Sequence, residues 1–212
     1  MKKFVINLKR RPDRLKQFQQ RCPYQDVEVV PAFDGKNVEL ESKKERKLVG
    51  MFPPDRQPGA VGCHITHMRI WKRMINENIH MAMIFEDDCQ FSHNFKEIME
   101  NLVMPEKLLI LFPGGRFKPN FVMPPEGITK AYEHVYQHNY TNWNNRLHDR
   151  TFHCYILTYQ LAKFLLNLTD ITVNPEPVDH FVIHSMRDLK LPVHSTQPLI
   201  AWSPMVGDSD IR

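Results

Sequence analysis

The sequence predicts an α/β fold organised as a single domain. Short apolar runs without Pro or Gly, such as residues 81–85, are typical of buried strands, and they alternate with segments such as 159–168 whose apolar residues recur at helical spacing. A chain of 212 residues is long for one domain and short for two, so one well-developed core is the simplest expectation. The contents of 42% hydrophobic and 25% charged residues are ordinary for a globular protein.

The first half of the chain contains three apolar runs that predict strands, separated by helical or turn-forming segments. Pro12 suits a first helical turn, and the turn at 31–35 contains Pro and Gly. In chain order, we expect a strand at 4–8, a helix opening near Pro12, a strand at 27–30, a turn at 31–35, a charged helix at 38–49, a proline-rich loop at 51–59, a glycine-rich loop that becomes a helix over 59–71, and a strand at 81–85.

The second half begins with the same alternation and then changes character. Between residues 117 and 149, Pro, Asn, His, Tyr and Trp replace the periodic aliphatic residues, which suits a lid or substrate wall and a disordered flap equally well. In chain order, we expect a helix at 91–103, a strand at 108–112 with a turn at 113–116, strand pieces within 128–136, an irregular loop at 137–146, a strand at 152–158, a helix at 159–168, a helix opening within 175–183, and one or two short strands within 191–202.

The net charge of +4 arises from 28 basic and 24 acidic residues, and the basic excess lies near the start of the chain. Such a cluster suits nucleic acid, an anionic membrane or the phosphates of a small ligand. No RNP or zinc-finger signature accompanies it, so a nucleic-acid-binding module is the weakest alternative and no nucleic-acid partner is expected. The cluster consists of Lys2, Lys3, Lys9, Arg10, Arg11 and Arg14.

Four widely spaced cysteines without a Cys-x-x-Cys pair argue against a zinc ribbon and a disulfide framework, so buried reduced thiols are expected. The apolar run 4–6 stops at Asn7, which is not the pattern of a signal peptide. No stretch approaches the roughly 20 apolar residues that a membrane span requires. A cytoplasmic or otherwise soluble intracellular location is therefore expected.

Glu86-Asp87-Asp88 ends the apolar run 81–85 with three consecutive carboxylates. Adjacent acids repel one another, and their removal from water is costly unless a positive charge neutralises them. Side chains alternate along an extended segment, so Glu86 and Asp88 are expected on one side and Asp87 on the other. Hard carboxylate oxygens favour magnesium, manganese or calcium. The alternative interpretation is an acidic loop that merely follows a strand.

Two further segments carry candidate site residues. Gly62 allows close approach of another backbone, and Thr66 and His67 fall where they could face a cleft. His64 and His67 could also ligate a metal, but no third ligand of a zinc site is apparent nearby. Asp179 lies in the first turn of an expected helix, where a capping residue and a catalytic base are equally good interpretations.

Together, basic residues at a first strand end, a glycine-to-helix segment and an acidic cluster at a central strand end suit a nucleotide diphosphate held partly through a metal. The P-loop pattern and Gly-x-Gly-x-x-Gly are both absent, which disfavours an ordinary NTPase and a dinucleotide oxidoreductase. A metal that binds a diphosphate leaving group is typical of glycosyl transfer from a nucleotide sugar. A metal-dependent phosphoester hydrolase, using the acids with His64 and His67, is the chief alternative.

The chain carries an ordered set of short motifs, which are Ile6-Asn7-Leu8 with Arg11-x-Asp13-Arg14, Phe33-Asp34-Gly35, Gly62-Cys63-x-x-Thr66-His67, Glu86-Asp87-Asp88, Pro177-Val178-Asp179 and Ser209-Asp210-Ile211. This set resembles glycosyltransferase family 25, which includes lipopolysaccharide galactosyltransferases and collagen glycosyltransferases. Two departures stand out: Thr66 occupies a position where the family usually has Ser, and residues 151–155 replace the commoner Gly-Thr-x-Ala-Tyr, so the acceptor side is expected to differ.

The resemblance implies a GT-A-like, Rossmann-type mixed sheet flanked by helices, with an acceptor-side loop region at 117–150. It implies transfer of a sugar, galactose or glucose, from a UDP-sugar donor to a hydroxyl of a glycan or protein acceptor, with Mn²⁺ (or Mg²⁺) and inversion. Asp179 matches the general base, and Glu86, Asp88 and Asp210 match the metal ligands. The implied donor-binding residues are Asn7, Arg11, Asp34, Gly35, Gly62, Thr66, His67, Glu86 and Asp87.

Overall fold

The structure is a computed structural model, and the residues described are 1–35, 45–46, 48–49, 52, 58–115, 128–132, 135–138, 152–171, 176–196 and 199–203. Most of the expected helix at 38–49 therefore lies outside the described residues. So do most of the expected loop at 137–146 and the whole motif that contains Asp210.

Strands and helices alternate over residues 2–86, whereas in the described remainder of the chain several strands, and then two helices, follow one another. The helices are α1 (Pro12–Arg21), α3 (Pro58–Asn76), α4 (Phe95–Asn101), α5 (Tyr159–Ile171) and α6 (Val178–Asp188). The strands are β1 (Lys2–Asn7), β2 (Glu28–Pro31), β3 (Met81–Glu86), β4 (Gln90–Phe91), β5 (Ile110–Phe112), β6 (Gly114–Gly115), β7 (Ile128–Tyr132), β8 (Val135–His138), β9 (Cys154–Thr158), β10 (Val193–Thr196) and β11 (Ala201–Trp202).

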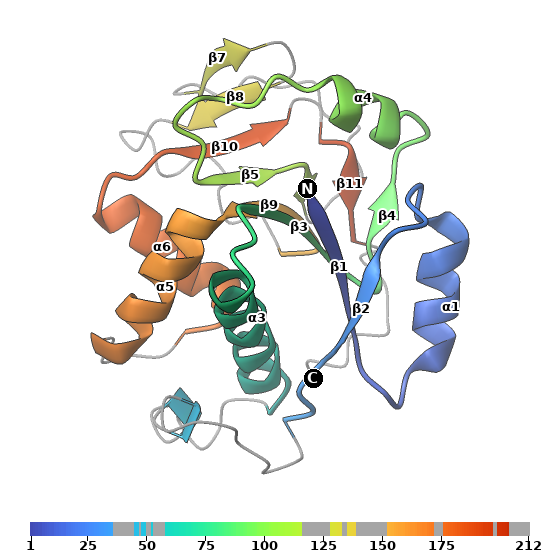
Figure 1. The fold of residues 1–212 in the computed structure, drawn as a ribbon, viewed down its shortest axis with the longest axis vertical. Helices are drawn as coiled ribbons and strands as arrows, with labels where there is room; N and C mark the ends of the chain where they lie inside the picture. The colour runs from blue at the N-terminus through green and yellow to red at the C-terminus, as the bar shows by residue number, and fades with distance from the viewer. Residues whose placement is uncertain are drawn as a thin grey trace.

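The central sheet is mixed and has the strand order β2-β1-β3-β9-β5-β10-β8-β7. β1 runs parallel to both β2 and β3, whereas β9 runs antiparallel to its neighbours β3 and β5. A second, smaller sheet has the order β4-β11-β6. Helices lie on both sides of the central sheet (Figure 1), which confirms the predicted α/β class with a mixed sheet flanked by helices.

Alternate residues of β1 and β3 pack on opposite faces of the central sheet. Phe4 and Ile84 belong to a core shared with α3, α5 and α6, whereas Val5 and Phe85 belong to a core shared with α1 and α4. Figure 1 shows the same division of the helices between the two faces. Burial on both faces explains why these strands read as continuous apolar runs in the sequence.

Two helices begin at other residues than the sequence-based expectation gives. The helix expected from residue 91 begins only at Phe95, because Phe91 lies in β4 and pairs with Ala201 of β11. The helix expected to grow out of a loop after Gly59 already begins at Pro58. Proline lacks the amide hydrogen that a first helical turn leaves unused, so it is well tolerated there.

Gly62 and Gly35 let the turn after β2 approach the start of α3. A Cβ on Gly62 would lie 2.5 Å from the carbonyl oxygen of Phe33, and a Cβ on Gly35 would overlap the carbonyl oxygen of Pro58. The predicted close backbone approach at Gly62 is thus confirmed, although Gly62 lies inside the helix. Any side chain at either position would push the turn away from α3.

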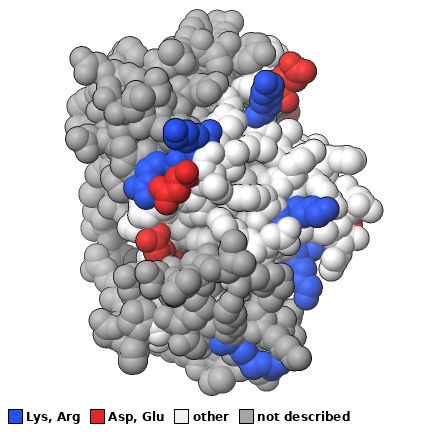
Figure 2. Space-filling view, turned by 90° about the vertical axis from the view of Figure 1, so that its left-hand side faces the viewer, with Lys and Arg blue, Asp and Glu red and all other residues white. Residues whose placement is uncertain are grey.

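The described part of the surface carries mixed charge on the face shown in Figure 2, where acidic side chains accompany several of the basic ones and no continuous basic stripe forms. No helix in the described part of the chain combines the length and apolar character needed to cross a bilayer.

His64 links α3 to the segment that precedes α6. Its Nδ1 donates to the carbonyl oxygen of Glu176 at 2.9 Å, so Nε2 is left without a proton in the neutral ring. Phe52, Trp71 and Phe181 surround the ring, and within the described residues Nε2 has no hydrogen-bond partner. Burial lowers the pKa of His64 to about 4.

This environment predicts a loss of stability on mild acidification. The unfolded chain takes up a proton at His64 near pH 6.5, whereas the folded protein does so only near its pKa of about 4, so the free energy of unfolding falls as pH decreases between these values. At about 1.4 kcal/mol per pKa unit, the total contribution of His64 is about 3 kcal/mol. Urea titrations from pH 7 to pH 4 measure this slope.

The variant His64→Gln should flatten the slope between pH 6.5 and 4, whatever its effect on stability at pH 7. His93→Gln, at an exposed position, is the matched control and should leave the slope unchanged. An identical slope in His64→Gln and in the wild type would contradict the prediction.

Candidate active site

The three consecutive acids leave the sheet where β3 ends. Glu86 is the last residue of β3 and pairs with Ile6 of the parallel strand β1. The following turn closes with a hydrogen bond from the Cys89 amide to the Glu86 carbonyl oxygen at 3.1 Å. The carboxylates of 86–88 therefore lie at the carboxyl end of a central strand, where open α/β sheets bind ligands.

Asp87 points toward β1 and α1. The Asn7 amide donates to its Oδ2 at 2.6 Å and also to the carbonyl oxygen of Arg11 at 3.0 Å, and Arg14 forms an ion pair with its Oδ1. Burial raises the pKa of Asp87 to about 6; the neighbouring acids add to this shift, while Arg14 and Asn7 oppose it. Asn7 thus joins the acidic turn to the loop between β1 and α1.

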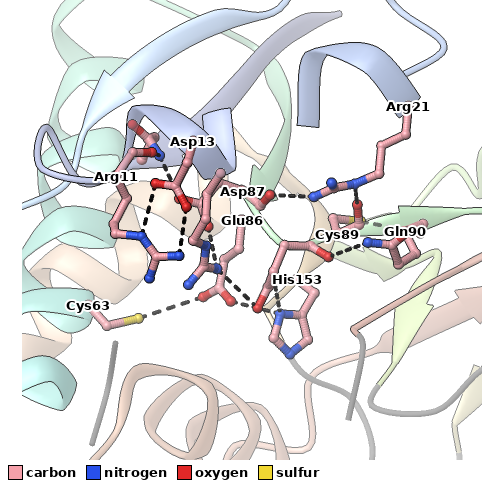
Figure 3. A network of polar contacts seen from close by, with 12 residues as sticks. Arg11, Asp13, Arg21, Cys63, Glu86, Asp87, Cys89, Gln90 and His153 are labelled. Carbon is pink, nitrogen blue, oxygen red and sulfur yellow. Dashed lines mark hydrogen bonds and ion pairs between the residues drawn. The ribbon is translucent and has the colours of Figure 1, made fainter. Parts of the chain in front are cut away.

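Glu86 and Asp88 both contact His153. Residues 87 and 88 lie in a turn after β3, and Arg14 contacts both Asp87 and Asp88, so the predicted strand alternation does not describe the three acids. His153 Nδ1 lies 2.8 Å from Oε2 of Glu86 and 3.1 Å from Oδ1 of Asp88 (Figure 3). Burial alone would lower the pKa of His153, but the two carboxylates raise it well above its usual value. Burial likewise opposes ionisation of Glu86, yet His153 and His67 hold its pKa below the usual range.

Arginines of α1 hold the acidic turn from one side. Arg21 donates from Nε to the carbonyl oxygen of Cys89 at 2.6 Å and from Nη2 to that of Asp87, and Arg14 lies 3.2 Å from Oδ2 of Asp88. Arg14 and Arg21 are two helical turns apart, so they share one face of α1. Their charges offset the repulsion among the acids.

Other members of the basic cluster pair with acids away from this turn. Arg11 contacts Asp13 at 2.9 Å, and Arg10 contacts Asp34, a predicted donor-binding residue, also at 2.9 Å. Arg14 is the residue of the basic cluster whose side chain pairs with Asp87 and Asp88 in the acidic turn.

Thr66 lies buried behind the turn at 33–35. Its hydroxyl accepts a hydrogen bond from the Phe33 amide at 2.9 Å and donates to the Gly62 carbonyl oxygen at 2.7 Å. Thr66 therefore holds the segment containing Asp34 and Gly35 against α3. A direct contact of Thr66 with a donor stays a prediction.

A second group of side chains reaches Glu86 from α3. His67 Nε2 and Cys63 Sγ each lie 3.8 Å from Oε1 of Glu86, and His67 Nδ1 lies 2.7 Å from the Tyr155 hydroxyl. Burial raises the pKa of the Cys63 thiol, and the charges of Glu86 and Asp179 raise it further. His64, which the sequence paired with His67, faces Glu176 instead.

Asp179 is the second residue of α6, and its Oδ1 accepts a hydrogen bond from the His180 amide at 2.9 Å. Pro177 is the N-cap of α6 and no side chain forms a cap hydrogen bond there, so Asp179 is an acid in the first helical turn, which suits the helix dipole, and not the capping residue. The charge of Asp179 also helps to raise the pKa of the Cys63 thiol. Stabilisation of the helix dipole and catalysis as a base therefore both stay open as interpretations of Asp179.

Within the described residues, two groups have ligand atoms close enough to hold a metal: Glu86 with Asp88 and His153, and Glu86 with Cys63 and His67. Sequence reasoning did not find His153 or Cys63 as site residues. The signals available were the departure from the family pattern around His153 and the i, i+4 spacing of Cys63 and His67.

The fold and the acidic turn together define an α/β protein with a candidate metal site at the end of a central strand. A family model described as "Glycosyltransferase family 25 (LPS biosynthesis protein)" matches residues 1–182. The chain belongs to glycosyltransferase family 25, as its motifs predict.

Relatives of this chain include animal members of the family. Human "Procollagen galactosyltransferase 2" is 30% identical over 154 residues, covering 66% of this chain and 24% of the relative. Bovine "Probable inactive glycosyltransferase 25 family member 3" is 31% identical over 238 residues, covering 98% of this chain and 37% of the relative. The chain therefore spans well under half the length of either relative.

A solved structure was also compared with this chain. It is titled "Crystal structure of a glycosyltransferase involved in the glycosylation of the major capsid of PBCV-1" and aligns with a TM-score of 0.49 and 7% sequence identity over 98% of this chain and 93% of its own.

The hydrogen bonds of Thr66 predict that a hydroxyl at this position, and not the threonine methyl group, is required to hold the turn at 33–35 against α3. Thr66→Val removes the acceptor of the buried Phe33 amide, which should cost about 1–3 kcal/mol and speed hydrogen exchange of that amide. Thr66→Ser retains the hydroxyl and is the matched control, so its Phe33 amide should exchange at the wild-type rate. Amide exchange measured by NMR tests this; equal protection in both variants would contradict it.

Proposed function

We propose that this chain is a metal-dependent hexosyltransferase that moves galactose or glucose from a UDP-sugar to a hydroxyl of a glycan or protein acceptor, with inversion. The observation that carries the proposal is the convergence of Glu86, Asp88 and His153 at the end of β3, beside Arg14. Membership of a glycosyltransferase family favours sugar transfer over phosphoester hydrolysis. The name of the human relative, a procollagen galactosyltransferase, supports galactose and a protein acceptor.

The residues present fit a hard divalent ion. Carboxylate oxygens with one imidazole suit Mn²⁺ or Mg²⁺. Octahedral bonds of 2.0–2.1 Å put adjacent ligand atoms about 3.0 Å apart, and His153 Nδ1 lies 2.8 Å and 3.1 Å from the oxygens of Glu86 and Asp88. His153 must release its proton to become a ligand. When bound, the ion would supply charge neutralisation for a diphosphate leaving group.

Residues at the end of β1 would hold the anionic part of the donor. Arg14, in the first turn of α1, supplies positive charge beside the acidic turn. Asn7 acts indirectly, because it orients Asp87 and the Arg11 carbonyl. We propose that Asp34 and Gly35 line the nucleotide and that Asp210 adds a metal ligand.

Asp179 would act as the general base. Its carboxylate takes the proton of the acceptor hydroxyl as that oxygen bonds to the anomeric carbon of the sugar. The bond from that carbon to the diphosphate oxygen breaks on the opposite face, and the electron pair leaves with UDP. General bases typically contribute ~100- to 10,000-fold to a rate.

The metal proposal predicts cooperative stabilisation by UDP and Mn²⁺. Ligand at 100 times its Kd stabilises by about 2.7 kcal/mol, which raises the Tm of a domain this size by roughly 5–10 °C. Both ligands together should give this rise, and each alone should give little. Differential scanning fluorimetry checks the result. Asp88→Asn should abolish the joint shift.

The control for that variant is Asp26→Asn, which removes an exposed acid paired with Lys3 and should keep the joint shift. The metal-dependent donor site would be refuted if UDP changed the Tm of the wild type under no metal condition.

The general-base proposal predicts that Asp179→Asn still binds the donor but transfers little sugar. This variant should retain the shift with UDP and Mn²⁺ but lose transfer by about 100- to 10,000-fold, because amide groups cannot accept the hydroxyl proton. Initial rates of UDP release with an accepted donor and acceptor measure transfer. Asp188→Asn, at the other end of α6, is the matched control. Normal transfer by Asp179→Asn would mean that Asp179 only stabilises the start of α6.

A further inference from the structure

The two carboxylate oxygens of Glu86 face different sets of side chains. Oε2 lies against His153, whereas Oε1 lies 3.8 Å from both Cys63 Sγ and His67 Nε2. Figure 3 shows Cys63 and His153 approaching Glu86 from opposite sides. Cys63 and His67 are four residues apart on α3, which puts both on one face of the helix.

His67 has an unpartnered ring nitrogen aimed at this group. Its side chain is fully buried, and among the described residues Nε2 has no hydrogen-bond partner. The 3.8 Å from Nε2 to Oε1 of Glu86 exceeds a hydrogen-bond length. The other nitrogen, Nδ1, lies 2.7 Å from the Tyr155 hydroxyl. The Tyr155 hydroxyl can accept a hydrogen bond from Nδ1, and in that tautomer Nε2 carries no proton, which is the usual arrangement of a metal-ligating histidine.

We infer that Cys63, His67 and Oε1 of Glu86 form a binding site for a soft divalent ion, with Zn²⁺ as its representative. Tetrahedral zinc bonds of 2.0–2.3 Å separate nitrogen or sulfur from a carboxylate oxygen by about 3.4–3.6 Å. The two observed distances of 3.8 Å need only a small contraction. All three ligand atoms lie within 4.8 Å of one another.

The ligands Cys63, His67 and Glu86 Oε1 differ chemically from the group formed by Glu86 Oε2, Asp88 and His153. A thiolate and an imidazole favour zinc-like ions, whereas the carboxylate-rich set favours manganese or magnesium. One thiolate and one carboxylate balance the charge of a divalent ion, and binding releases the thiol proton of Cys63 to solvent. Cys63 and Glu86 are partly exposed, so an ion can enter from their side, and the fourth position is open to water. This inference does not depend on the proposed transfer activity.

Cobalt substitution tests the site in the full chain. Co²⁺ added to the wild-type protein should produce a thiolate-to-cobalt charge-transfer band that saturates at one equivalent and disappears when Zn²⁺ displaces the cobalt. Cys63→Ser should abolish the band and weaken Zn²⁺ binding at least 100-fold, whereas Cys22→Ala, which removes a distant thiol, should retain both. Tyr155→Phe should weaken Zn²⁺ binding roughly 10- to 100-fold, because the partner that orients His67 is lost.

The variant Asp88→Asn distinguishes the two ligand groups that share Glu86. It should leave the Zn²⁺ affinity within about twofold of the wild-type value, since Asp88 belongs to the group at Oε2 and not to the group at Oε1. The inference is overturned if wild-type protein gives no charge-transfer band, or if the band persists in Cys63→Ser. It is also overturned if Asp88→Asn weakens Zn²⁺ binding as much as Cys63→Ser does. Absence of the band from wild-type protein overturns the inference even if a variant fails to fold.

Discussion

The mutual repulsion of three carboxylates at the end of β3 is the constraint on which the site depends. Removing such charges from water is costly unless cations and hydrogen-bond donors surround them. Arg14 and Arg21 approach from α1, Asn7 approaches from β1, and His153 closes the opposite side. Because these partners come from separate elements, neutralising the turn also fixes how α1 and β9 meet the central strands.

Strand order explains why His153 reaches this turn. β9 runs antiparallel to β3, so the start of β9 lies beside the end of β3, with Cys154 paired to Phe85. The residue before Cys154 must then lie beside Glu86, and the Glu86 amide donates to the His153 carbonyl oxygen at 3.0 Å. Backbone pairing between β3 and β9 thus places the His153 imidazole beside the carboxylates of Glu86 and Asp88. This position makes His153 a candidate metal ligand.

The helix α3 supports the site through several of its early residues, each with a different partner. Thr66 and Gly62 hold the turn after β2, whereas Cys63 and His67 face Glu86. His64 falls on another side of the helix and joins the segment before α6, which carries Asp179. One helix therefore connects the predicted nucleotide side, the acidic turn and the candidate base.

Local patterns in the sequence determined the strand that runs into Glu86, the helix opening at Pro12, and the family, because these depend on neighbouring residues and on motif order. Only the tertiary structure decided which side chains complete the site. His153 lies 65 residues from Asp88, and Cys63 lies 23 residues from Glu86. Such pairs meet through strand order and helix packing, which no local spacing encodes.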